Sequence, residues 1–199
     1  MRRSTRIILA ATLVAGILSA ALPPSAGAFD AAGQKCRASI AKAGAGLSKS
    51  LFKVVTGCHK GRDKSGALSA TDCNTISGAD AKGGIPGAET KFGDGVTKAC
   101  TGSSAPLLYT GCPAPCDSTV PTVSTFPQVA DCLKCLARDN TEGFADAAYG
   151  TPSSPAANAA NAACHGGITK ATASLYASVL KTISACQAAA EKTGSESFT

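Results

Sequence analysis

The stretch CRASIAKAGAGLSKSLFKVVTGC, residues 36–58, has a cysteine at each end and apolar or small residues at regular intervals between them. These residues are Cys36, Ile40, Ala43, Leu47, Leu51, Val54, Val55 and Cys58. Steps of three and four residues predict a helix that buries one face. The interval between the two cysteines corresponds to about six turns, or roughly 33 Å, so both lie on that face.

A second stretch, CHGGITKATASLYASVLKTISAC at residues 164–186, aligns with the first without gaps. Nine of its 23 positions are identical, including both cysteines and the pairs Ile40/Ile168 and Leu47/Leu175. Its own helical stripe is Cys164, Ile168, Ala171, Leu175, Val179, Ile183 and Cys186. We interpret the two stretches as an internal repeat, a duplicated helix.

Two such helices packed antiparallel bring Cys36 opposite Cys186 and Cys58 opposite Cys164. The spacing therefore predicts one disulfide at each end of the helix pair, the alternative being that each stretch pairs elsewhere. His59 and His165 each follow one of these cysteines, so they would lie close together. They are candidates for a weak surface metal site or a pH-sensitive contact, but we favour two polar residues at a helix end, because two ligands make an incomplete metal site.

The first 28 residues have the features of a secretory signal peptide. Arg2, Arg3 and Arg6 precede an uncharged, mostly apolar run, and small residues at 26–28 fit a cleavage site. We expect a secreted chain, periplasmic or extracellular, with no stable membrane span once the signal is removed. Loss of the three arginines leaves 16 basic and 13 acidic residues, a net charge of +3. This mild charge, with 5% aromatic residues, predicts no nucleic-acid partner.

All ten cysteines follow the signal, which in a secreted chain predicts a framework of up to five disulfides. Between the two repeated stretches, Cys73 and Cys100 are the natural pair. A Pro-rich segment and the helix after it suggest the nested pairs Cys112–Cys135 and Cys116–Cys132. Alternatively, Cys132 and Cys135 form a C-x-x-C redox pair, or join Cys112 and Cys116 in a zinc site, although an oxidising compartment disfavours free thiolates.

The expected fold is a single all-α domain over residues 29–192, a disulfide-stapled bundle whose long N- and C-terminal helices are antiparallel. Helices are predicted at about 34–59, 127–149 and 162–192, with a tail at 193–199. The Pro/Gly-rich middle, about 60–125, is predicted to be irregular apart from short helices. One could run through Cys73 after a capping box at residues 69–72, and another could start at Pro86 and end at Gly93-Asp94-Gly95.

The CPAPCDS turn, the DCLKCLA helix ending in AAYGTP and the Cys-bounded helices resemble a group of secreted, cysteine-rich proteins predicted from bacterial genomes. The resemblance covers most of the mature chain. It implies a protein of the bacterial envelope or exterior, and it carries over no catalytic residue.

The remaining patterns favour a non-enzymatic structural or binding protein without a cofactor. The segment from Gly61 to Asp72 echoes a calcium loop, but glycine occupies the first ligand position, so an ordinary turn is the better interpretation. Neither G-x-S-x-G nor H-E-x-x-H occurs. Partners would be an extracellular or envelope component, or copies of the chain itself. A basic helix side could meet acidic polymers or simply keep the bundle soluble; it comprises Lys42, Lys49, Lys53, Lys170 and Lys181. The alternatives are a saposin-like carrier of lipids or small hydrophobic ligands, and a redox or metal protein that uses Cys132 and Cys135.

Overall fold

The computed structural model describes residues 30–65, 72–103, 111–151 and 156–193, and all regular structure within them is helical. The elements are α1 (Ala31–Ser65), α2 (Ile76–Ala79), α3 (Gly84–Cys100), α4 (Phe126–Tyr149) and α5 (Ala159–Thr193). The all-α prediction is therefore confirmed. The proposed signal peptide at 1–28 lies outside the described residues.

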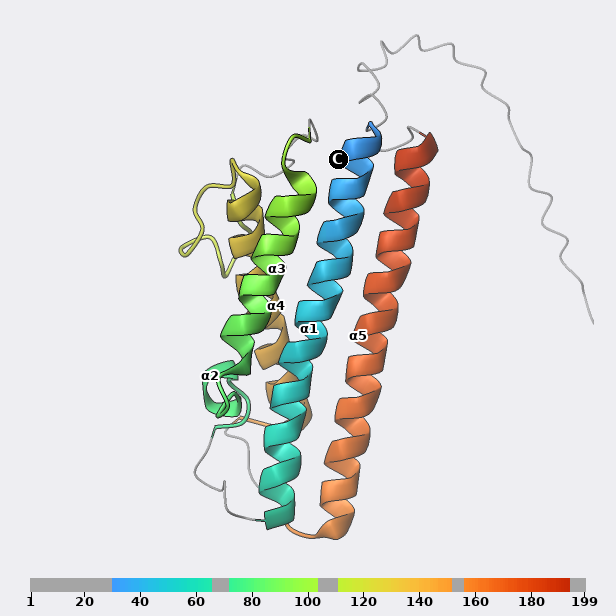
Figure 1. Cartoon of the computed structure of the whole chain (residues 1–199). Coiled ribbons are helices and arrows are strands. Elements are labelled where there is room, and N and C mark those ends of the chain that lie inside the picture. The colour runs from blue at the N-terminus through green and yellow to red at the C-terminus, as the bar shows by residue number, and fades with distance from the viewer. Residues whose placement is uncertain (1–29, 66–71, 104–110, 152–155, 194–199) are drawn as a thin grey trace, which may run out of the picture.

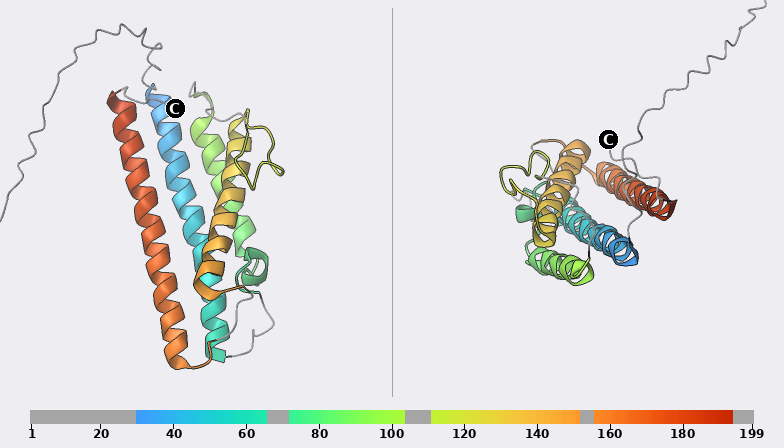
Figure 2. Two further views of the ribbon diagram at one scale, coloured as in Figure 1. Left: turned by 180° about the vertical axis from the view of Figure 1, so that it is seen from behind. Right: turned by 90° about the horizontal axis from the view of Figure 1, so that it is seen from above.

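The four long helices form an elongated bundle in which successive long helices alternate in direction (Figure 1). α1 is the central element and contacts each of the other four helices. Seen from above, α3 and α5 stand on opposite sides of α1 (Figure 2). The prediction that residues 60–125 are irregular is wrong in part, because α3 forms a helix of 17 residues within them.

The apolar stripe of α1 forms the centre of the hydrophobic core. Its buried residues pack against α3, against one residue of α2 and against three residues of α4. The core comprises Cys36, Leu47, Leu51, Val55, Ile76, Ile85, Phe92, Val96, Cys100, Ala130, Ala145 and Tyr149. α5 contributes none of these residues. The helix at the C-terminal end is thus attached to the bundle without sharing its core.

α3 explains why the middle of the chain is more ordered than expected. Asp80 accepts hydrogen bonds from the backbone N–H groups of Gly84 (2.9 Å) and Ile85 (2.7 Å), which caps the start of the helix. The helix then continues through Gly93 and Gly95 because Phe92 and Val96 are buried against α1. Tertiary packing here outweighs the low helix propensity of glycine.

Disulfides near both ends of the apolar stripe of α1 join it to another segment, but that segment is not the predicted C-terminal helix. Cys36 bonds to Cys100 at one end of the stripe, and Cys58 bonds to Cys73 near the other. The pairs Cys36–Cys186, Cys58–Cys164 and Cys73–Cys100 are therefore wrong. The reason is that α3, and not α5, is the antiparallel helix that covers the stripe of α1.

The Pro-rich segment is fastened to α4 by two further disulfides, Cys112–Cys132 and Cys116–Cys135. The four cysteines were correctly grouped, but the nested pairing is wrong. The backbone N–H of Cys112 donates to the carbonyl of Val120 (3.3 Å), so Cys112 lies beside the chain that enters α4. It therefore meets Cys132, which precedes Cys135 along that helix, and a small second core of valines forms around the bridges.

The helix ends follow ordinary capping chemistry and lie within a few residues of the predicted bounds, except that α1 extends to Ser65. α4 begins at a capping box, in which Thr125 accepts from the backbone N–H of Gln128 (3.4 Å) and Gln128 accepts from that of Ser124 (2.9 Å). Asn158 caps α5 by accepting from the N–H of Asn161 (2.9 Å). The predicted tail lies almost wholly outside the described residues.

α5 lies beside α1 in the opposite direction (Figure 1), with a register that does not align the cysteines. The rings of Phe52 and Tyr176 are 5.3 Å apart, and Asp63 lies at 3.4 Å from His165. Cys186, ten residues after Tyr176, is thus level with position 42 and not with Cys36. The six-residue difference corresponds to about 9 Å along the helix, too far for a disulfide. Cys164 and Cys186 are exposed free thiols.

Candidate functional site: a lysine-lined groove between α1 and α5

An open groove of about 2030 Å³ runs along the bundle between α1 and α5. The rings of Phe52 and Tyr176 meet between the two helices, whereas much of the remaining wall consists of small residues, which leave space between the helices. Alanines from both helices, among them Ala41, Ala45 and Ala173, form much of its wall. The groove is therefore apolar along most of its length.

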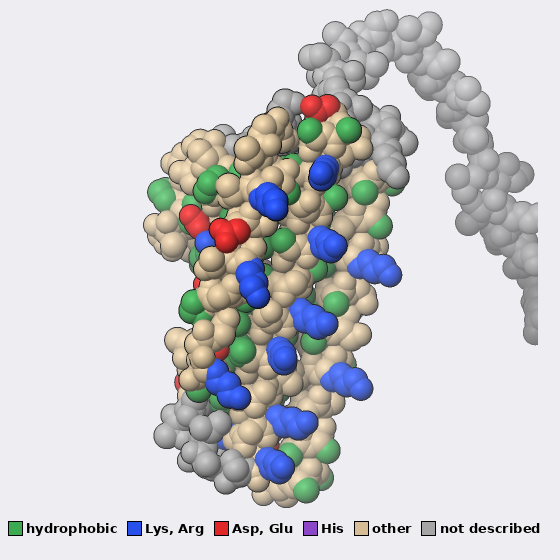
Figure 3. Space-filling view, in the orientation of Figure 1, with side chains coloured by type: hydrophobic (Ala, Val, Ile, Leu, Met, Phe, Trp, Pro, Cys, Tyr) green, Lys and Arg blue, Asp and Glu red, His purple; other side chains and the backbone are tan. Residues whose placement is uncertain are grey.

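Lysines border this groove on both sides. α1 contributes Lys35, Lys42, Lys49, Lys53, Lys60 and Lys64, and α5 contributes Lys170 and Lys181. All eight are exposed. Figure 3 shows Lys and Arg side chains along α1 and α5 on this face. Within the described residues none of the eight lies in an ion pair, and Asp63 is the single acidic side chain of the groove wall.

Asp63 and Tyr149 mark the end of the groove where the chain enters α5. The Asp63 carboxylate accepts a hydrogen bond from the backbone N–H of Ala156 (2.9 Å) and lies 3.4 Å from Nδ1 of His165. The Tyr149 hydroxyl is hydrogen-bonded to that of Thr169. Burial raises the pKa of Tyr149, so the phenol is protonated at neutral pH. These contacts tie α5 to α1 and α4.

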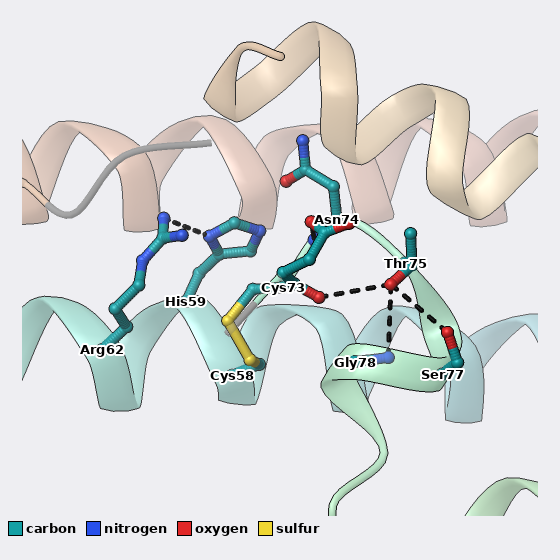
Figure 4. The surroundings of a disulfide bond; sticks show 9 residues. Cys58, His59, Arg62, Cys73, Asn74, Thr75, Ser77 and Gly78 are labelled. Carbon is teal, nitrogen blue, oxygen red and sulfur yellow. Dashed lines mark hydrogen bonds between the residues drawn. A yellow bond between two sulfur atoms is a disulfide. The ribbon is translucent and has the colours of Figure 1, made fainter. Parts of the chain in front are cut away.

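Behind this end of the groove lies His59, which is only 1% exposed. Its ring stacks on that of Tyr149 with 3.4 Å between centroids, and the buried guanidinium of Arg62 donates to its Nδ1 at 2.8 Å. Figure 4 shows Arg62 directed at the ring, next to the Cys58–Cys73 disulfide. Burial, and then the charge of Arg62, lower the pKa of His59 to about 4, and Asn74 and Asp63 oppose this shift only in part.

Asn74 joins the same polar cluster to α4. Its side-chain amide donates to a carboxylate oxygen of Asp146 (2.6 Å) and to the carbonyl of Gly150 (2.8 Å). Together with the Cys58–Cys73 bridge, these bonds hold the segment before α2 between α1 and α4. The cluster is therefore a structural junction between α1, the segment before α2, and α4.

The two histidines are brought together, as expected, but without the disulfide that was to join them. His165 contacts the Tyr149 ring edge-on at 5.3 Å, so both histidines touch the same ring. Nδ1 of His59 is already occupied by Arg62. Among the described residues, no three His, Cys, Asp or Glu side chains are grouped so as to hold a metal ion.

The other candidate motifs are placed differently from their sequence patterns. Of the calcium-like segment, Gly61, Asp63 and Ser65 belong to α1, while residues 66–71 lie outside the described residues. Residues 61–65 are helical, which does not fit the first half of a calcium loop. The turn that we favoured in its place is not present at residues 61–65 either. Cys132 and Cys135 are both in disulfides, with Cys112 and Cys116 respectively, so neither is a free thiol.

The five lysines singled out in the sequence all lie on the groove. Sequence reasoning missed Lys35, Lys60 and Lys64, although intervals of seven and four residues along α1 place all six lysines on one face. It also missed the partners of His59, because Tyr149 comes from a distant helix.

Comparison with protein-family models, with curated proteins and with solved structures finds no match for this chain. None of the helices in the described part of the chain is both long and apolar enough to cross a membrane. The four disulfides are consistent with an oxidising, extracellular or periplasmic location.

Proposed function

We propose that this chain is a secreted, disulfide-stabilised binding protein whose α1–α5 groove takes elongated amphiphiles that carry an anionic group. The observation that carries the proposal is the combination of an alanine-lined groove with eight exposed lysines along it. The apolar part of the ligand would lie on the alanines, and its anionic group would meet the lysine ammonium groups. Secretion is supported by the N-terminal residues 1–28 and by the disulfides.

The charge arrangement favours an anion over a neutral ligand. Apart from Asp63 the described groove wall is without carboxylates, so the ammonium groups are not neutralised by the protein itself. The long aliphatic stems of the lysines extend the apolar surface while their charges remain in water. A saposin-like carrier role is thus close to this proposal, whereas free thiols or metal at Cys132 and Cys135 have no support.

The apolar wall also separates an amphiphile from an acidic polymer. An acidic polymer would bind through the lysines alone, and its affinity would not depend on the alanines between the two helices. An acyl chain needs both, because burying its methylene groups supplies about 0.8 kcal/mol each.

The test is titration of the purified protein with a fluorescent long-chain fatty acid, followed by displacement with unlabelled fatty acid or with polyglutamate. The triple variant Lys42→Gln/Lys49→Gln/Lys53→Gln should weaken binding by roughly 3- to 160-fold, from about 0.2–1 kcal/mol for each exposed ion pair. The matched control Lys82→Gln/Lys91→Gln/Lys98→Gln removes three exposed lysines that do not line the groove.

A second pair of substitutions tests the apolar wall. Ala45→Phe with Ala173→Phe should obstruct the groove at its alanine-lined wall and reduce fatty-acid binding without removing a charge. Displacement of the probe by polyglutamate but not by fatty acid, or equal binding by all variants, would contradict the proposal.

A further inference from the structure

α5 carries an exposed apolar stripe whose sequence counterpart in α1 is buried. Ile168, Leu175, Val179 and Ile183 are 42%, 64%, 45% and 50% exposed. They align with Ile40, Leu47, Leu51 and Val55 of α1, of which the last three are fully buried and the first packs against the core. The same pattern of apolar side chains is thus buried by other helices in α1 and exposed to solvent in α5.

The two ends of the stripe show the same contrast. In α1, Cys36 and Cys58 are both bonded to the antiparallel segment that covers the helix. In α5, Cys164 and Cys186 are free and exposed. The other eight cysteines of the chain are already paired, and about 33 Å of helix separates these two. Neither thiol has a disulfide partner within its own molecule.

We propose that the exposed stripe of α5 is the interface with a second copy of this chain, packed antiparallel about a two-fold axis. Cys164 would bond to Cys186 of the partner subunit, and Cys186 to Cys164 of the partner subunit. The proposal is independent of the groove, because none of Cys164, Leu175 and Cys186 lines it.

The stripe has the symmetry that such a pairing requires. In an antiparallel two-fold pair, residues equally distant from the axis face each other. Leu175 is midway between Cys164 and Cys186, eleven residues from each, and among the described residues it is the most exposed of the large apolar side chains. Ala171 and Val179 follow at four residues on either side. α1 already shows the same kind of arrangement: bridges near both ends of its stripe join it to the segment from Cys73 to Cys100, which contains the antiparallel helix α3.

Each bridge would form by thiol–disulfide exchange with a disulfide donor of the oxidising compartment. The Cys164 thiolate attacks the donor, which releases one thiol and leaves a mixed disulfide on the protein. The thiolate of Cys186 from the partner subunit then attacks the protein sulfur and releases the second thiol. The two cysteines lose two electrons and two protons, and the donor is reduced to two thiols.

The test uses the mature chain with its four intramolecular disulfides. The protein is first kept free of air and is then treated with oxidised glutathione as the disulfide donor. A mixture of ¹⁴N- and ¹⁵N-labelled protein is oxidised, alkylated before unfolding and mapped without reduction. We expect a covalent dimer and a Cys164–Cys186 peptide that joins a light and a heavy chain. Cys164–Cys164 and Cys186–Cys186 peptides would show a parallel pair and overturn the proposal, as would a monomer with both thiols alkylated or capped by glutathione.

Two variants separate the apolar stripe from the thiols. Leu175→Asp retains both cysteines but places two carboxylates at the axis, and it should abolish most of the covalent dimer. Cys164→Ser/Cys186→Ser should still associate reversibly in sedimentation as its concentration rises. The matched control Ser174→Asp adds the same charge on the groove side of α5 and should dimerise like the parent. Equal dimer yields for Leu175→Asp and Ser174→Asp would refute the interface.

Discussion

Replacement of His59 by glutamine should remove a specific part of the pH dependence of stability. In the folded chain the pKa of His59 is lowered to about 4, whereas in the unfolded chain it is near 6.5. Between these values the unfolded chain binds a proton that the folded chain does not, so stability is lost as pH falls through this window. The linkage relation gives a loss of about 2 kcal/mol between pH 7.5 and pH 5.

The measurement is urea unfolding of the parent chain and of His59→Gln at several pH values from 7.5 down to 4.5. The difference in the free energy of unfolding between the two proteins isolates His59 from the carboxylates, which titrate in both. The charged and titratable groups around the ring are Arg62 and Asp63 of α1, Tyr149 of α4 and His165 of α5. His165→Gln serves as the control, because it removes the other histidine and leaves His59 in place. Identical pH profiles for the parent and His59→Gln would refute the burial argument.

Three further predictions concern stability and binding. Leu47→Ala should lower the free energy of unfolding by about 2–5 kcal/mol, whereas Leu175→Ala, at the aligned position, should change it by less than about 0.5 kcal/mol. Both are measured in the Cys164→Ser/Cys186→Ser background, at a concentration low enough to keep the chain monomeric. Similar values for the two variants would contradict the difference in burial. Removal of the Cys36–Cys100 bridge, with a sequence separation of 64, should cost about 4 kcal/mol and removal of Cys58–Cys73, with a separation of 15, about 3 kcal/mol, as measured by denaturant unfolding of paired Cys→Ala variants. Fatty-acid affinity should fall as salt is raised in the parent and less steeply in Lys42→Gln/Lys49→Gln/Lys53→Gln, because salt screens exposed charges; equal slopes would exclude a contribution from these lysines.

The helices at both ends of the chain were predictable because their stripes are local patterns. Ile40, Leu47 and Leu51 lie on one helical face whatever covers them. The identity of the covering helix was not predictable in the same way. The spacing of Cys36 and Cys58 matches α5, but it also accommodates the segment from Cys73 to Cys100, and periodicity does not distinguish the two.

α3 was underestimated for a related reason. Gly93 and Gly95 predict a helix end when only local propensity is considered, while burial of Phe92 and Val96 against α1 keeps the helix intact. The basic side of the groove was partly predictable from the spacing of lysines. The groove itself was not, because it depends on how closely α5 approaches α1 around Phe52 and Tyr176.

The disulfides are confined to residues 36–135, and α5 lies entirely beyond them. Its attachment includes the ring contacts of Tyr176 and His165, the Tyr149–Thr169 hydrogen bond and the contacts of Asp63, without a share in the core. Local opening free energies in proteins follow such differences in burial and cross-linking. We therefore expect α5 to behave as a separate foldon: its backbone amides should exchange with solvent through detachment of one helix, whereas those of α1 and α3 should exchange through global unfolding.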